Sequence, residues 1–242
     1  MIKKQINQND TLKLEFIKTL KNEFEFNKSP INRVKKKDNN SEEKFIDKNK
    51  VKNLNNLKER INSIEDCNLK KNATQIVFND GNLQSKIMIV GEGPGQKEDQ
   101  IGKPFVGDAG ELLNKMLKAI NLKRESIYIT NVVNFRPPNN RKPEPSEISR
   151  YSHFLKEHIA IIDPKILVLM GSTAMEAIFG SKIKISKERG SWKETIINNK
   201  TYLSMITFHP AYLLRQADQK KYSWIDLKKI RKKIDELKLT FQ

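Results

Sequence analysis

The sequence predicts an α/β fold, a three-layer α/β/α arrangement around a central, mostly parallel sheet of four strands. Four short apolar segments have the length and composition of buried strands. Segments whose apolar residues recur at helical spacing lie between them. Strands that alternate with helices build βαβ units, and such units produce a parallel sheet.

The first part of the chain is predicted to be an extension rather than a domain. Residues 1–50 are rich in Lys, Asn and Glu, and apart from an amphipathic stretch at 12–26 with a helical pattern they offer little to bury. We therefore expect a flexible, basic N-terminal extension followed by one domain at 51–242. Leu54, Leu57, Ile61 and Ile64 stand at helical spacing and predict a helix that opens this domain.

The elements of the domain follow in order. Strands are expected at 86–90, 127–133, 166–170 and 203–208. Asp108 is expected to cap a helix, Ser146 a second one that Asp163 and Pro164 end, and a third follows Gly171 to Gly180. A final helix over 220–239 is expected to pack one apolar face, made of Trp224, Leu227, Ile230, Ile234 and Leu237.

Composition excludes several classes of protein. No apolar run approaches the roughly 18 residues that cross a bilayer, so an integral membrane protein is excluded. The N-terminus is basic but lacks the apolar stretch of a secretory signal. The single cysteine, Cys67, excludes an internal disulfide and a metal site held by several thiolates. We expect an intracellular protein.

The charge balance favours a polyanionic partner. There are 46 basic and 29 acidic residues, a formal net charge of +17 at pH 7. Such a charge favours binding to nucleic acid. The alternative is a basic surface that is only solvated, because a composition rich in Lys and Asn also follows from an AT-rich genome.

Unusual residues follow three of the four expected strands. Residues 91–95 read Gly-Glu-Gly-Pro-Gly, Asn131 ends the second strand, and His209-Pro210 follows the fourth. Ligands of open parallel sheets bind beyond the carboxyl ends of the strands, so we expect these residues to meet in one site. Residues 96–98 read Gln-Lys-Glu, which matches neither a dinucleotide fingerprint nor a P-loop.

Four sequence blocks resemble a known family. They are GEGPGQKEDQIGKPFVGDAG at 91–110, ITNVV at 129–133 followed by RPPNNRKP at 136–143, Arg189-Gly190, and TFHPAYLLR at 207–215. In this order and spacing they resemble the signature blocks of the family 4 uracil-DNA glycosylases, over roughly residues 55–225.

The resemblance implies roles for the pocket residues. Phe105 is expected to stack on uracil, Asn131 to read its N3–H and O4, and His209 to donate to O2, with Gly93 completing the pocket. Without the family, Phe105 would be a core residue and Asn131 a turn cap. His153 and His158, both in an expected helix, are expected to be structural.

Two carboxylates and a set of DNA contacts complete the expected site. Glu92 and Glu98 are both candidates to position or activate the attacking water, and a surface carboxylate is the alternative for Glu98. The DNA contacts implied by the resemblance are an apolar wedge and phosphate-binding arginines. They are Leu213, Leu214, Arg215, Arg136 and Arg189, with Arg141 and Lys142 as further candidates. A helix start whose leucines enter the core is the alternative for residues 213–214.

The chain departs from the family at the cofactor. Family members hold a four-iron four-sulfur cluster through four cysteines, and the aligned positions here are Ile64, Cys67, Phe135 and Tyr151. Three of these cannot supply a cluster thiolate. We therefore expect no cluster and no metal, and packing among the four side chains in its place.

Together these observations predict a monofunctional DNA glycosylase. It would hydrolyse the N-glycosidic bond of uracil in DNA and leave an abasic site for base excision repair. A catalytically silent DNA-binding protein is the alternative, and a nucleotide-binding enzyme is disfavoured by the failed phosphate motifs. We expect uracil-containing DNA, single- or double-stranded, as the partner, no membrane contact, a monomer, and a nucleoid-associated location in a bacterial cytoplasm.

Overall fold

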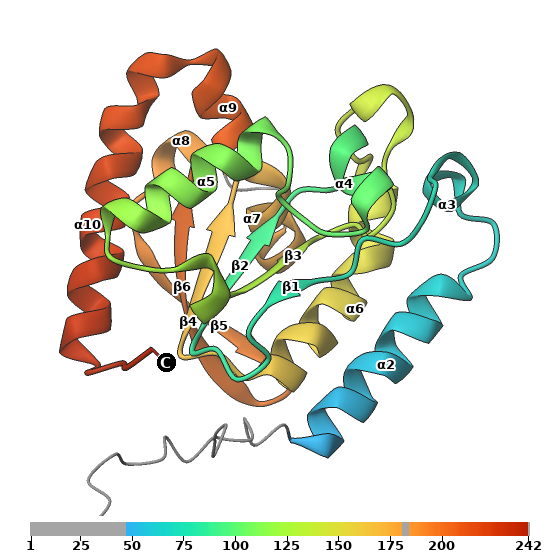
Figure 1. Cartoon of the computed structure of the whole chain (residues 1–242), viewed down its shortest axis with the longest axis horizontal. Coiled ribbons are helices and arrows are strands. Elements are labelled where there is room, and N and C mark those ends of the chain that lie inside the picture. The colour runs from blue at the N-terminus through green and yellow to red at the C-terminus, as the bar shows by residue number, and fades with distance from the viewer. Residues whose placement is uncertain (1–46, 181–183, 242) are drawn as a thin grey trace, which may run out of the picture. The chain divides into compact units, whose positions relative to one another are not determined.

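The computed structural model describes residues 47–180 and 184–241, and its centre is a six-stranded sheet in the order β1-β3-β2-β4-β6-β5 (Figure 1). Four strands, β3, β2, β4 and β6, run parallel in the middle, and β1 and β5 pair antiparallel at the two edges. The strand bounds are β1 Asp80–Gly81, β2 Ile87–Gly91, β3 Tyr128–Asn131, β4 Ile166–Met170, β5 Trp192–Ile197 and β6 Lys200–Thr207.

The expected four-stranded sheet is therefore wrong in its count, although its four parallel strands are confirmed. The edge strand β1 has two residues, too few for a sequence pattern. The strand β5 forms a hairpin with β6 through Asn198 and Asn199, whose φ angles are 47° and 59°. Two successive positive φ angles are typical of the tight turn that joins twisted antiparallel strands, and asparagine tolerates them.

Helices cover both faces of the sheet, which confirms the three-layer arrangement (Figure 1). Met88 and Val90 of β2 face a core that contains residues of the helices α2, α6 and α7. Ile87 and Ile89 of the same strand face a second core, with residues of α5, α9 and α10. The bounds are α2 Lys48–Asn62, α5 Asp108–Ala119, α6 Pro145–Ile162, α7 Ser172–Phe179, α9 Pro210–Arg215 and α10 Lys220–Glu236.

Short helical segments complete the connections between the layers. Their bounds are α3 Asn68–Asn72, α4 Gln96–Ile101, α8 Ile185–Glu188, η1 Arg124–Ser126, η2 Pro138–Asn140 and η3 Ala217–Gln219. Within the described residues, none of the helices combines the length and the apolar character needed to cross a bilayer. Residues 1–46 of the predicted extension, with the stretch at 12–26, lie outside the described residues. The helix α2 begins at Lys48, three residues before the predicted domain boundary.

Two helix caps differ from the expected residues. The N-cap of α5 is Gly107 instead of Asp108, which becomes the first helical residue. The N-cap of α6 is Glu144 instead of Ser146, and Glu147 accepts a hydrogen bond from the backbone N–H of Glu144 in a capping box. The other end of α6 is as expected, because Asp163 ends it with a φ of 56°.

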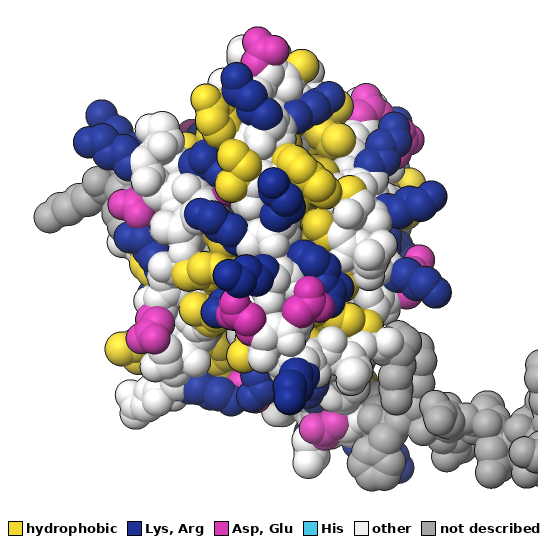
Figure 2. All heavy atoms as spheres, turned by 90° about the vertical axis from the view of Figure 1, so that its left-hand side faces the viewer, with side chains coloured by type: hydrophobic (Ala, Val, Ile, Leu, Met, Phe, Trp, Pro, Cys, Tyr) yellow, Lys and Arg dark blue, Asp and Glu magenta, His cyan; other side chains and the backbone are white. Residues whose placement is uncertain are grey.

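The helix α10 packs a narrower face than expected. Leu227, Ile230 and Ile234 are buried, but Trp224 is 44% and Leu237 is 45% exposed. The expectation that these two side chains pack inward is wrong, since Ser223 and Asp226 occupy the buried positions of the first turns and Leu237 lies beyond the helix end. Figure 2 shows the side of the molecule that carries α10, where Lys and Arg side chains surround small hydrophobic areas.

Candidate active site

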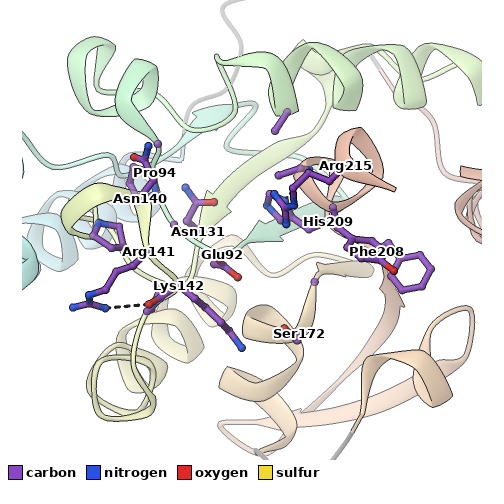
Figure 3. Close-up of a pocket in the computed structure, with 18 of the residues that line it drawn as sticks. Glu92, Pro94, Asn131, Asn140, Arg141, Lys142, Ser172, Phe208, His209 and Arg215 are labelled. Carbon is purple, nitrogen blue, oxygen red and sulfur yellow. Dashed lines mark hydrogen bonds between the residues drawn. The ribbon is translucent and has the colours of Figure 1, made fainter. Parts of the chain in front are cut away.

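A cavity of about 990 Å³ opens at the carboxyl edge of the parallel strands (Figure 3). The register pairs Gly91 of β2 with Asn131 of β3, so the residues that follow the central strands share this edge. The structure brings most of the sequence-predicted site residues to the cavity wall. These are Glu92, Gly93, Glu98, Phe105, Asn131, His209 and Arg215, together with the further candidates Arg141 and Lys142.

Phe105 and Gly93 line the cavity, and Gly91 lies next to the side chains of Asn131 and Phe105. The Phe105 ring stacks on the His209 ring with 5.3 Å between centroids and 26° between planes. A Cβ on Gly91 would lie 2.4 Å from Asn131 Oδ1 and 2.6 Å from the Phe105 ring. A Cβ on Gly93 would lie 2.7 Å from a methyl group of Val133. Glycine at position 91 therefore leaves room for the side chains of Asn131 and Phe105, and glycine at position 93 leaves room for Val133.

Glu98 is committed to the backbone of the loop that carries Phe105. Its Oε1 accepts hydrogen bonds from the backbone N–H groups of Val106 (2.9 Å) and Gly107 (2.8 Å), and its Oε2 accepts one from Gly95 (3.1 Å). The side chain is buried, so the surface-carboxylate alternative is wrong. These contacts satisfy both carboxylate oxygens and favour a role in shaping the loop over activation of water.

Glu92 is the second carboxylate of the cavity, and it has one protein partner. Its Oε2 accepts a hydrogen bond of 2.5 Å from the hydroxyl of Thr173, a buried residue in the first turn of α7. Within the described residues, Oε1 takes no hydrogen bond and remains available to a water molecule. Thr173 was not predicted from the sequence. It follows the carboxyl end of β4, the one expected strand that no unusual residues follow.

His209 presents a hydrogen-bond donor to the cavity. Its Nδ1 accepts a hydrogen bond of 3.2 Å from the backbone N–H of Ala211, so the proton of the neutral ring is on Nε2. Nε2 is buried and has no partner among the described residues. Burial, and secondarily the charge of Arg215, lowers the pKa of His209 to about 4. The imidazole is therefore neutral near pH 7, and its Nε2–H group is available to donate a hydrogen bond to a ligand.

Asn131 ends β3 with its amide at the cavity wall. The residue is almost fully buried, yet within the described residues its side chain makes no hydrogen bond to the protein. An amide that lines a cavity without a protein partner has to obtain its hydrogen bonds from a ligand or from water. Its acceptor and its two donors are free to recognise a ligand.

The other two histidines lie on α6, outside the cavity. His158 is buried, its Nε2 is 2.6 Å from the hydroxyl of Tyr128, and its ring stacks on Phe78. Burial lowers the pKa of His158 to about 3. His153 is exposed. Neither residue contributes to the cavity wall.

Some of the predicted DNA contacts are exposed, and others are buried or already bonded to groups of the protein. Leu214 is 47% exposed and Arg215 is exposed, but Leu213 is 1% exposed and packs in the core, so its predicted place in a DNA wedge is wrong. Arg189 donates to the buried Asp226 and lies over the rings of Phe208 and Tyr222, which occupies its guanidinium.

The remaining basic candidates also have partners inside the protein. Arg136 Nε donates to Asn140 Oδ1 at 2.8 Å. Arg141 makes a two-pronged ion pair with Glu147. Lys142 lies 3.9 Å from the carboxylate of Glu176. Arg215 and Lys142 are therefore the predicted cations that combine exposure with a place at the cavity wall.

The positions aligned with cluster ligands do not fit an iron–sulfur cluster. Cys67 Sγ lies 3.4 Å from the hydroxyl of Tyr151, and Phe135 and Ile64 pack in the same hydrophobic core. One thiol is present where a cluster needs four thiolates. No three His, Cys, Asp or Glu side chains of the described residues are grouped to hold a metal ion.

Comparison with known proteins gives a consistent family. Residues 78–229 match the model of the uracil DNA glycosylase superfamily. The type-4 uracil-DNA glycosylase of Thermotoga maritima is 44% identical over 160 residues, which cover 66% of this chain and 82% of that protein. Those of Sulfurisphaera tokodaii and Archaeoglobus fulgidus are 42% and 37% identical, covering 74% of this chain and 83% and 92% of theirs.

Proposed function

The chain belongs to the uracil DNA glycosylase superfamily and acts as a uracil-DNA glycosylase, and from this premise we propose that the cavity at the sheet edge holds the flipped uracil. The proposal rests on the observation that an aromatic ring, the amide of Asn131 and the imidazole N–H of His209 line one cavity, and that neither polar group has a hydrogen-bond partner among the described residues. A glycosylase needs these three features, because it must hold an extruded base and stabilise it as it leaves.

Uracil recognition follows from the chemistry of Phe105 and Asn131. The phenyl ring offers a flat face for stacking on the base. The amide oxygen of Asn131 accepts the N3–H of uracil, and its NH₂ group donates to O4. Cytosine presents an acceptor at N3 and a donor at C4, so both contacts would be lost. This difference excludes the normal base while admitting its deaminated product.

His209 stabilises the leaving group. Breaking the bond between N1 and the sugar leaves negative charge on uracil, and the neutral imidazole donates its Nε2–H to O2 as that charge develops. A buried, preoriented donor is worth about 10² to 10³ in rate. The low pKa of His209 keeps the ring in the required neutral form.

Glu92 is assigned to the attacking water. One of its oxygens is held by Thr173, and the other is free to accept a hydrogen bond from water. The water oxygen bonds to the sugar carbon, its proton passes to the carboxylate or solvent, and the electron pair of the broken bond leaves with uracil. The carboxylate also faces the positive charge that develops on the sugar. No lysine is required as a covalent nucleophile.

DNA is engaged by exposed groups beside the cavity. We propose that the exposed Leu214 fills the space that the flipped base leaves, and that Arg215 at the cavity wall contacts a phosphate. We propose that the protein acts as a monomer on single- and double-stranded DNA. Because its substrate is uracil-containing DNA, we propose that the protein is located at the nucleoid of a bacterial cytoplasm.

Catalysis is proposed to proceed without an iron–sulfur cluster. The contact between Cys67 and Tyr151 and the packing of Phe135 and Ile64 join the segments that a cluster would otherwise connect. Protein purified without metal supplementation should be colourless, contain no iron or acid-labile sulfide, and keep full activity after treatment with a chelator. Brown protein with stoichiometric iron and sulfide would contradict the proposal.

The test of function is excision from a defined oligonucleotide. A strand with one uracil is incubated with the protein and then heated in alkali, which cleaves abasic sites. The wild-type protein should produce the cleaved strand, and Asn131→Ala and His209→Ala should lose most of the activity. His153→Ala is the matched control, because that histidine is exposed and outside the cavity. Folded protein that binds DNA without cleavage would support the silent DNA-binding alternative.

A further inference from the structure

The peptide bond between Phe105 and Val106 lies between a cation and an anion. Its carbonyl oxygen accepts a hydrogen bond of 3.0 Å from a terminal nitrogen of Arg124. Its N–H group donates to the carboxylate of Glu98 at 2.9 Å. The other terminal nitrogen of Arg124 donates to the carbonyl of Pro104 at 2.7 Å. The guanidinium thus holds both carbonyls that flank the backbone of Phe105.

Arg124 is itself anchored to two other parts of the fold. Its Nε donates to Asp80 in β1 at 2.8 Å, and a terminal nitrogen also donates to Asn114 in α5 at 3.2 Å. The side chain is 16% exposed and is not part of the cavity wall. It therefore contacts the loop from behind and has no direct access to a ligand in the cavity.

The backbone of Phe105 needs such support. Its φ is 53°, in the left-handed region that bulky L-residues rarely adopt. The loop is also pressed against α5, because a Cβ on Gly110 would lie 1.9 Å from the Phe105 carbonyl oxygen. A strained conformation persists only where the surroundings fix it. Without the guanidinium, we expect this peptide group to rotate and the phenyl ring to lose its orientation at the cavity wall.

We propose that Arg124 is a positioning residue that holds the ring of Phe105 in the orientation for stacking on uracil. The inference rests on the proposed function, since it assumes that Phe105 stacks on the base. It explains why a largely buried arginine directs two of its nitrogens at carbonyls of a loop instead of at a second carboxylate. Planar, forked donors suit this task, and a lysine ammonium cannot reproduce them.

The test compares Arg124→Lys and Arg124→Met with wild type in three measurements. These are uracil affinity by titration calorimetry, the single-turnover rate of excision, and affinity for DNA with an abasic site, which offers no base to stack on. Base–aromatic stacking is worth about fivefold or more in affinity. We expect Arg124→Met to weaken uracil binding and slow excision by about five- to tenfold, Arg124→Lys to do so less, and abasic DNA to bind as before.

Arg231→Lys is the matched control. Arg231 also pairs with a carboxylate, Asp235, and also donates to a backbone carbonyl, that of Ile120, but it does not line the cavity. This substitution should leave all three measurements unchanged. The midpoint of unfolding is recorded for each variant, so that a loss of folded protein is separated from a loss of stacking.

A double variant decides whether Arg124 acts through Phe105. In a Phe105→Ala background the ring is absent, so Arg124→Lys or Arg124→Met should cause no further loss of uracil affinity. Losses that multiply would overturn the inference, as would unchanged uracil affinity in Arg124→Met with only a lowered unfolding midpoint. A wild-type protein that excises no uracil would overturn the proposed function as well, whereas normal excision in both Arg124 variants would overturn this inference alone.

Discussion

The neutral imidazole of His209 predicts that the chemical step is insensitive to pH between 8 and about 5. Burial and the nearby Arg215 lower the pKa of His209 to about 4. Protonation would also place a proton on Nδ1, where it would face the backbone N–H of Ala211 that now donates a hydrogen bond to this nitrogen. Lowering the pH to 5.5 therefore should not charge the ring.

The size of the effect follows from this pKa. At pH 5.5 a group with a pKa of about 4 is roughly 97% neutral, whereas a histidine with the ordinary value of 6.5 is roughly 9% neutral. If the neutral ring donates to uracil O2, the two cases differ about tenfold in rate at that pH. Such a difference is easily measured.

The assay is single-turnover excision from a uracil oligonucleotide at pH values from 5 to 8.5, with the unfolded fraction checked at each pH. The control is His209→Asn, which keeps a donor but has no titrating ring. A tenfold fall with a midpoint near pH 6.5 in wild type, absent from His209→Asn, would refute the reasoning. The same midpoint in both proteins would assign the titration to another group.

Three further predictions concern contacts outside the imidazole. Thr173→Val should slow single-turnover excision about tenfold, because Glu92 loses a charge-assisted hydrogen bond, and Thr173→Ser should restore it. His158 stays neutral in the folded protein, whereas the same histidine in the unfolded chain takes up a proton below pH 6.5. The free energy of unfolding should therefore fall by about 2 kcal/mol between pH 8 and 5 through this residue. Urea unfolding of His158→Gln should show less of this loss. Asp226→Asn should lower the free energy of unfolding by about 3 kcal/mol, because Arg189 keeps its charge without a buried partner.

The central sheet was predictable because its strands are buried on both faces. Strands such as β4, with five buried apolar residues in a row, leave a continuous pattern in the sequence. The edge strand β5 has exposed and half-buried residues, and β1 has two residues, so neither leaves one. Edge strands depend on pairing with a neighbour that a local pattern does not reveal.

Glu92, Asn131 and His209 were predictable because they lie at or directly after strand ends, and Phe105 only through the family resemblance, but their partners were not predictable. Thr173 and Glu92 are 81 positions apart, and Arg124 reaches the Phe105 loop from 19 positions away. No local pattern reports such pairs. The same limit explains Arg189, whose role as a DNA contact depended on being free, and which the fold pairs with Asp226.

The exposed cations around α10 and the buried cavity respond differently to ionic strength. Charges in contact with water are screened within about 8 to 10 Å at physiological salt, whereas contacts inside the cavity are screened far less. Added salt therefore should slow the encounter with DNA and shorten each sliding excursion along it, while the rate of bond cleavage after the base is enclosed stays the same. The search for uracil along DNA thus depends on ionic strength, because it relies on charges in contact with water. The cleavage of the glycosidic bond does not, because it takes place among groups inside the cavity.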